Sequence, residues 1–249
     1  MRLFLPPALL VALVFLGATT TPRARANEKD ALAIVERAIK AQGGSAALTR
    51  AAQCKRTDTG TQAILTRDVP FVSKVTRSLP DRVRLQIELD KKITTTLVMD
   101  GNRGWQAEGE SPSVQLPLAR VREMREEAYV WWLTTLVPLT KSGFTLSTLE
   151  RTRIDGEPAV GIRVVSKGHP DSRLYFLERN GLLAKIERRV TEAGREIDKE
   201  YLYSSYKEFD GVYLPTREII KVNREKFTEL IISNYTFPEK LGAGAFARP

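Results

Sequence analysis

Hydrophobic and polar residues alternate along most of the chain after residue 50. The clearest example is the segment 82–89, RVRLQIEL, in which every second side chain is apolar. This period of two predicts a β-strand with one buried face and one solvated face. The segment 92–99 is rich in β-branched residues and predicts the next strand. The candidate cavity-lining residues on these two strands are Val83, Leu85, Ile87, Leu97 and Met99.

The same alternation, interrupted by turn signals, continues to the end of the chain. Asp-Gly and Asn-Gly pairs, which favour tight hairpins, stand at 155–156, 180–181 and 210–211. Short links without intervening helices predict antiparallel neighbours, in a single domain of about 10 or 11 strands. The remaining predicted strands are 53–63, 71–78, 144–153, 159–166, 172–177, 182–190, 196–209, 212–222 and 226–237.

Two segments have helical periodicity instead. Asp30 is suited to cap a helix over 31–42, which Gly43 and Gly44 would end. A second helix is predicted over 118–137, between Pro117 and Pro138, in the middle of the strand order. Its apolar stripe and the residues that follow it are candidates to face the sheet. They are Leu118, Val121, Met124, Ala128, Trp131, Trp132, Leu136 and Leu139.

Trp131 and Trp132 are adjacent, so their side chains point about 100° apart on a helix and at most one faces the sheet squarely. One interpretation is that they belong to a lid that touches an acyl chain or a membrane surface. The other is ordinary packing of a helix on a sheet.

A sheet of this size exposes more apolar surface than two helices cover. Ten strands give a footprint of roughly 950 Å², of which the helices cover about 400–600 Å². We therefore predict a half-open antiparallel β-barrel, with an N-terminal helix and a helical lid over an apolar cavity. The alternative is an interior filled completely by large side chains.

The first 26 residues have the pattern of a secretory signal peptide. An apolar run at 3–17 follows Arg2, and Ala24-Arg25-Ala26 matches a cleavage site. We predict export to the periplasm with cleavage after Ala26 and a mature domain over 27–249; an uncleaved anchor is the alternative. The apolar runs later in the sequence are too short to span a bilayer. Cys54 lies far beyond the cleavage site, so we expect a small buried side chain and no lipid attachment.

Composition narrows the function. The net charge of +9 falls when the signal peptide leaves, since the remainder has 36 basic and 30 acidic residues. These alternate in sequence, as in Glu187-Arg188-Arg189, and form no basic stripe for nucleic acid. One Cys and one His exclude a disulfide and a His/Cys zinc site. His169 lies in a Gly-His-Pro turn, where we expect it exposed and inert. Arg120, Arg122 and Arg125 are expected to form a solvated helix face with Glu123, Glu126 and Glu127.

Several segments are similar to one known family. The mature chain resembles the superfamily of periplasmic outer-membrane lipoprotein-sorting proteins (LolA/LolB-like). The resemblance implies a half-closed barrel with a helical lid over a cavity for acyl chains. Without a lipid-attachment cysteine, the chain is more similar to the soluble carrier than to the anchored acceptor. The segments that carry the resemblance are 31–44, 98–105, 156–160, 174–183, 206–215 and 235–237, with Phe246.

The resemblance also implies partners. A carrier of this type takes its cargo from an inner-membrane release complex and gives it to an outer-membrane acceptor. The carrier's functional arginine has no unique counterpart, because Arg56, Arg67 and Arg84 all lie in plausible strands.

Three functions follow from these observations. The first is a periplasmic, monomeric carrier of a lipid or a lipoprotein acyl chain, without catalytic residues, metal or cofactor. The second is a structural or interaction module of the cell envelope with the same fold. The third is a hydrolase of envelope polymers, which requires paired carboxylates in a cleft. Glycine-loop, G-x-S-x-G and H-E-x-x-H motifs are missing from the sequence.

Overall fold

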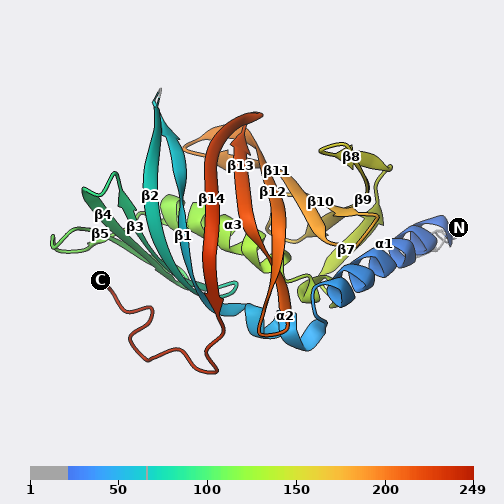
Figure 1. Ribbon diagram of the computed structural model, residues 1–249, viewed down its shortest axis with the longest axis horizontal. Helices are drawn as coiled ribbons and strands as arrows, with labels where there is room; N and C mark the ends of the chain where they lie inside the picture. The colour runs from blue at the N-terminus through green and yellow to red at the C-terminus, as the bar shows by residue number, and fades with distance from the viewer. Residues whose placement is uncertain (1–21, 66) are drawn as a thin grey trace, which may run out of the picture.

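One large antiparallel sheet dominates the molecule (Figure 1). The computed structural model describes residues 22–65 and 67–249, and within them 14 strands join in the order β6-β5-β4-β3-β2-β1-β14-β13-β12-β11-β10-β9-β7, with β8 paired to β9. The strands are β1 (Gln53–Ile64), β2 (Arg67–Ser78), β3 (Arg82–Leu89), β4 (Ile93–Asp100), β5 (Arg103–Glu108), β6 (Val114–Gln115), β7 (Phe144–Thr148), β8 (Thr152–Ile154), β9 (Glu157–Ser166), β10 (Ser172–Leu177), β11 (Leu183–Glu192), β12 (Arg195–Phe209), β13 (Val212–Val222) and β14 (Glu225–Thr236).

The sheet is curled but does not close. Its central pairing joins the two ends of the domain, since β1 pairs with β14 as well as with β2. The two-residue strand β6 ends one edge and β7 ends the other. Helix α1 (Pro22–Ala41) packs along β7, and the short helix α2 (Ser45–Ala51) leads from it into β1 (Figure 1).

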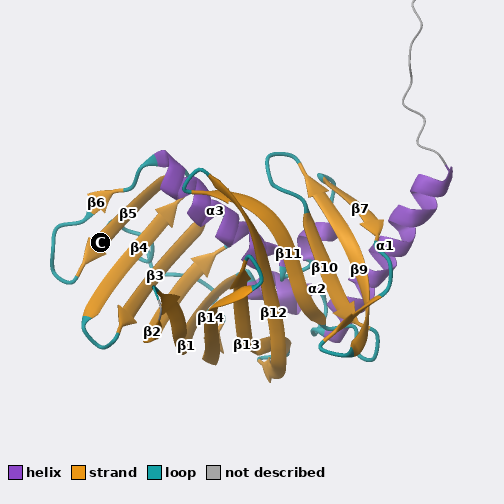
Figure 2. Ribbon diagram, turned by 90° about the horizontal axis from the view of Figure 1, so that it is seen from above, coloured by secondary structure: helices purple, strands orange, loops and turns teal. Residues whose placement is uncertain are grey.

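Helix α3 (Leu118–Leu133) lies in the hollow of the curled sheet (Figure 2). It passes under the β3–β5 region and continues beneath the central strands. A 3-10 turn, η1 (Val137–Thr140), connects it to β7. The helix therefore has strands on two sides, and the sheet places the inward side chains of both halves against it.

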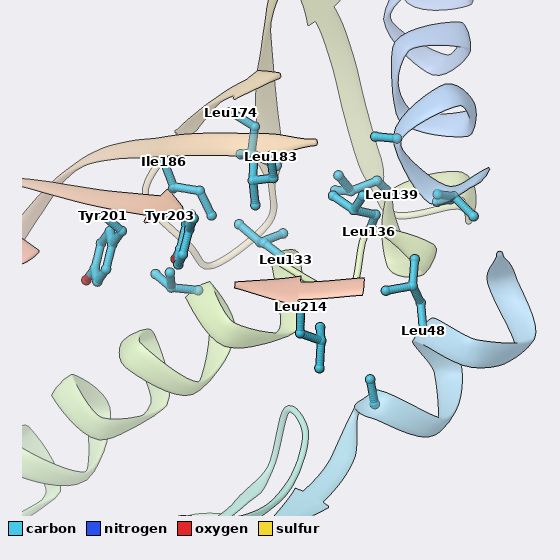
Figure 3. Packing of buried hydrophobic residues seen from close by; sticks show 14 of the residues in the cluster. Leu48, Leu133, Leu136, Leu139, Leu174, Leu183, Ile186, Tyr201, Tyr203 and Leu214 are labelled. Atoms are coloured by element: carbon cyan, nitrogen blue, oxygen red, sulfur yellow. The ribbon is translucent and has the colours of Figure 1, made fainter. Parts of the chain in front are cut away.

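The main hydrophobic core lies where the helices meet the second half of the sheet. Figure 3 shows leucines of α2, α3 and η1 packed near the inward side chains of the β10–β13 region. Tyr201 and Tyr203 point from β12 toward α3 in this view. Both tyrosines are buried, as is Cys54 at the start of β1, which was predicted as a small buried side chain.

The C-terminal tail packs on the first half of the sheet. Arg84 of β3 donates a hydrogen bond of 3.0 Å to the carbonyl of Ala247. Arg248 donates to Ser113, and the guanidinium of Arg82 lies 5.0 Å from the ring centroid of Phe246. Arg84 therefore binds the C-terminal tail rather than α3.

The predicted fold class is confirmed, and the strand count needs correction. The 14 strands exceed the predicted 10 or 11 because β5 and β6 were not predicted and 144–153 divides into β7 and β8. Strand β6 has only two residues, and β5 has too little alternation to be recognised alone. Residues 149–151 separate β7 from β8, and both strands pair with β9.

The helix bounds also differ from prediction. The predicted second helix ends four residues early, at Leu133, because Thr134 and Thr135 bond back to the carbonyls of Trp131 and Trp132 and Leu136 adopts a positive φ of 59°. Helix α1 begins at Pro22, eight residues before the predicted cap. Residues 1–21 of the predicted signal peptide lie outside the described residues.

Candidate functional site: the concave face beneath helix α3

An apolar cluster joins one face of α3 to the first half of the sheet. Val121 and Ala128 are buried against Val75, Val83 and Met99. The predicted candidates Leu85, Met124 and Trp131 pack on this cluster as partly buried side chains. The structure thus brings together seven of the residues that the alternation and the helical stripe nominated. They are Val83, Leu85, Met99, Val121, Met124, Ala128 and Trp131.

The other nominated residues lie elsewhere. Leu118, at the start of α3, is 67% exposed. Leu136 and Leu139 follow the helix and are buried in the main core, which Trp132 also contacts. Ile87 is partly buried at the edge of that core, and Leu97 is half-buried opposite Leu85.

The second half of α3 makes polar contacts with the sheet. Oε2 of Glu126 accepts a bond of 2.5 Å from Nη2 of Arg188 on β11. Its other oxygen lies 2.9 Å from Nδ1 of His169. Burial would raise the pKa of the Glu126 carboxyl, but its bonds to His169 and Arg188 lower that pKa below its usual value. The ring of His169 also stacks on Tyr129 of α3, with 3.7 Å between the ring centroids. The prediction that His169 is exposed in its turn is therefore wrong.

Glu127 makes a second set of polar contacts. Its Oε1 accepts bonds of 2.6 Å from Nζ of Lys199 and 2.9 Å from the hydroxyl of Tyr201, both on β12. Lys199 also donates to Glu192 of β11. Burial would lower the pKa of the Lys199 ammonium, but these carboxylates raise that pKa above its usual value. Glu126 and Glu127 were expected on a solvated face, and they lie instead against the sheet.

A buried ionic group occupies the centre of the concave face. Nε of Arg56 on β1 lies 3.2 Å from Oδ2 of Asp58, and Nη1 lies 3.7 Å from Oε2 of Glu218 on β13. Ser73 of β2 donates a bond of 3.0 Å to Asp58. Burial raises the pKa of the Glu218 carboxyl to about 7, although Arg56 acts in the opposite direction. Oε1 of Glu218 has no hydrogen-bond partner among the described residues.

Trp131 covers this ionic group from the helix side. The guanidinium carbon of Arg56 lies 5.3 Å from the ring centroid, and that of Arg77 on β2 lies 5.8 Å from it. Both distances permit cation–π attraction, which is strongest where the cation is removed from water. Of the three arginines considered from the sequence, Arg56 lies under α3, Arg67 is exposed and Arg84 bonds the C-terminal tail.

These charged residues were not predicted, although the sequence contains a signal for them. In an alternating strand, a charged residue in phase with the apolar positions points inward. Arg188 stands in phase with Ile186 and Val190, and Lys199 stands in phase with Tyr201. A buried cation needs an anionic partner, so the sequence already indicated that Arg188 and Lys199 each require a carboxylate from elsewhere in the chain.

Part of the concave face remains accessible beside α3. Leu85 and Leu97 form a cross-strand pair of β3 and β4, and Leu89 pairs with Ile93, which is exposed. Ile87 lies between these pairs. This apolar strip continues from the buried cluster under α3 to the hairpin that joins β3 and β4.

A pocket of about 440 Å³ lies on the opposite face of the sheet. It is bounded by the β8–β9 hairpin and by outward residues of β12 and β13, among them Leu202, Arg217 and Ile219. Residues of α3 do not line it, so it is separate from the site described above.

Neither a metal site nor a membrane span is evident in residues 22–65 and 67–249. His, Cys, Asp and Glu residues do not gather there in groups of three or more that could hold a metal ion. The helices in these ranges are too short or too polar to cross a bilayer.

Solved structures with the same arrangement of a curled sheet and helices exist. Neither the protein-family models nor the curated proteins match this sequence. A LolA superfamily protein from Nitrosomonas europaea is similar over 88% of this chain and 97% of its own, with a TM-score of 0.59 and 15% identity. This chain has the LolA superfamily fold.

Two further structures agree with the assignment. A proposed outer membrane lipoprotein-sorting protein domain from Vibrio parahaemolyticus covers 89% of this chain and 97% of its own, with a TM-score of 0.52 and 10% identity. A DUF1329 family protein from Desulfovibrio piger covers 87% and 96%, with a TM-score of 0.52 and 13% identity. In this LolA-like fold, α3 covers part of the concave face of the sheet.

Proposed function

We propose that this protein is a non-catalytic periplasmic carrier that binds an acyl chain of a lipid or lipoprotein on the concave face of its sheet. The observation that carries the proposal is the apolar strip of β3 and β4, which runs from an exposed edge into the cluster beneath α3. The LolA-like fold supports it, since one structure with this fold is a proposed lipoprotein-sorting domain.

Binding a long chain requires α3 to move. Val121, Ala128 and Trp131 occupy the inner end of the strip in the present arrangement. A chain that enters beside Leu85 and Leu97 would displace them, and its burial would replace the helix contacts. Each buried methylene contributes about 0.8 kcal/mol, so affinity should rise roughly fourfold per methylene until the strip is filled.

Export is the second part of the proposal. Cleavage after Ala26 would remove the first five residues of α1 and leave Asn27 at the N-terminus. Oδ1 of Asn27 accepts a bond of 2.8 Å from the hydroxyl of Thr148 on β7, so the shortened helix keeps this contact. N-terminal sequencing of protein recovered from the periplasm should begin at Asn27. An intact Met1 in the membrane fraction would support an uncleaved anchor.

Quenching by a brominated fatty acid tests acyl binding directly. Bromine quenches indole fluorescence at short range, and Trp131 borders the proposed path whereas Trp105 lies on β5 near Arg103. We expect saturable quenching in the wild type, less quenching in Trp131→Phe and unchanged quenching in Trp105→Phe. Mass spectrometry of an organic extract of the purified protein should find bound lipid. Absence of both signals would favour an interaction module of the cell envelope.

A further inference from the structure

Two buried cations stand directly opposite each other on the concave face. Arg188 of β11 and Lys199 of β12 are partners in the antiparallel register, and both point inward. Their side chains are only 1% and 9% exposed. Like charges at directly opposed positions destabilise a sheet, and burial adds the cost of desolvation. This pair is therefore stable only with anions beside it.

Helix α3 supplies most of those anions. Glu126 bonds Arg188 through a carboxylate oxygen and also through its backbone carbonyl at 3.2 Å. Glu127 bonds Lys199 and Tyr201. If α3 moves, Arg188 keeps only a 3.4 Å bond to the carbonyl of Pro170, while Lys199 keeps Glu192. Nε of Arg188 is buried and has no hydrogen-bond partner among the described residues even with α3 in place.

We propose that Arg188 and Lys199 bind the anionic head group of the acyl ligand when α3 moves, in place of Glu126 and Glu127. The proposal rests on the acyl-binding function proposed above and specifies its ligand as an anionic amphiphile. A phosphate monoester fits the donors, because a guanidinium and an ammonium both bond phosphate oxygens and Tyr201 offers a hydroxyl beside them. The lid carboxylates act as internal competitors of the head group.

The test compares two ligands that differ only in the phosphate group. Binding of 1-myristoyl lysophosphatidic acid and of 1-myristoyl glycerol is measured by calorimetry below their critical micelle concentrations, at low and at high salt. We expect the phosphate ligand to bind at least about tenfold more tightly at low salt, as a charge-assisted contact allows. Added NaCl should reduce this difference, and Arg188→Gln/Lys199→Gln should abolish it while binding of the neutral ligand persists.

A lid variant with a matched control tests the competition. Glu126→Gln/Glu127→Gln should increase affinity for the phosphate ligand by about tenfold relative to the neutral one. Glu123→Gln on the same helix is the control, since Glu123 contacts Arg120 and the backbone N–H of Ala193 instead of the two cations. Because the Glu123 carboxylate acts on Lys199 only through space, this variant should change the ratio of the two affinities much less than the double variant does. Thermal unfolding confirms that each variant is folded.

The outcomes separate the two proposals. Equal affinity for the charged and neutral ligands would overturn the head-group site and leave the carrier function intact. Failure of both ligands to bind would overturn the carrier function, and the head-group site with it. Binding of inorganic phosphate or glycerol 3-phosphate as tightly as the lipid would assign the cations to a free phosphate and overturn their role in an amphiphile.

Discussion

Nη1 of Arg56 lies 3.7 Å from Oε2 of Glu218, and both side chains are almost completely removed from solvent. Asp58 lies on the same strand as Arg56 and shares its guanidinium at 3.2 Å. Two carboxylates thus compete for one cation in the centre of the sheet. The more distant of the two, Glu218, has its pKa raised by burial to about 7.

This raised pKa predicts a pH-dependent contribution to stability. Glu218 binds its proton more tightly in the folded chain than in the unfolded chain, where its pKa is near 4.5. Its stabilising contribution is complete below about pH 4.5 and is lost as the pH rises to about 7. The free energy of unfolding should fall by up to about 1.4 kcal/mol per pH unit in that window from this residue.

Glu218→Gln is the test of that window. Urea unfolding at several pH values should show that the variant, relative to the wild type, gains stability between pH 4.5 and 7 and no further above it. The facing groups Arg56, Asp58, Arg77, Glu127 and Tyr203 remain in both proteins, so the difference isolates Glu218. A difference that is independent of pH would contradict the prediction.

We expect two substitutions of Trp131 to differ in their cost to stability. Trp131→Phe retains an aromatic face over Arg56 and Arg77, whereas Trp131→Leu removes it. We expect Leu to cost about 1–2 kcal/mol more than Phe, since both cations are buried. The matched pair at Trp105, whose partner Arg103 is exposed, should differ by less than about 1 kcal/mol. Urea unfolding followed by circular dichroism measures all four, and equal contrasts at the two sites would argue against the cation–π contact.

The sequence predicted which segments are strands and which of their side chains face inward, because the alternation of apolar and polar residues within each segment is enough to show both. Val83, Met99 and Val121 were nominated from two local patterns, and the structure pairs Val83 with Met99 and places both against Val121. The polar half of the site could not be obtained in this way. Glu126 has Arg122 four residues before it, and both glutamates lie in a charged run, so a solvated face explained them equally well. Only the tertiary fold brings Glu126 to Arg188 and Glu127 to Lys199.

An added methyl group at Gly60 is expected to be strongly destabilising. A Cβ at Gly60 would lie 2.1 Å from the carbonyl oxygen of Glu229, a backbone atom of the paired strand β14 that cannot turn away. Gly60→Ala should therefore destabilise the protein by about 3 kcal/mol or more, at the upper end of overpacking. Gly242→Ala is the control, because nothing lies within 4 Å of its added Cβ. Thermal unfolding compares them, and a Gly60→Ala variant as stable as the control would show that the β1–β14 pairing is looser than described.

A reversible cross-link between α3 and β5 tests whether the helix must move for binding. An added Cβ at Gly104 would lie 2.9 Å from Cγ2 of Val121, close to the separation of about 3.0 Å between a disulfide sulfur and the Cβ of its partner. Gly104→Cys/Val121→Cys should therefore oxidise readily. The single native cysteine, Cys54, is buried and does not compete.

We expect the oxidised double variant to bind the brominated fatty acid at least about tenfold more weakly than the wild type, because α3 is held over the inner end of the apolar strip. Reduction with dithiothreitol should restore binding. Each single-cysteine variant controls for the substitutions and should respond little to reduction. Full binding by the oxidised protein, with the cross-link confirmed by mass spectrometry, would show that acyl chains enter without displacement of α3 and would place them on the exposed strip of β3 and β4 alone.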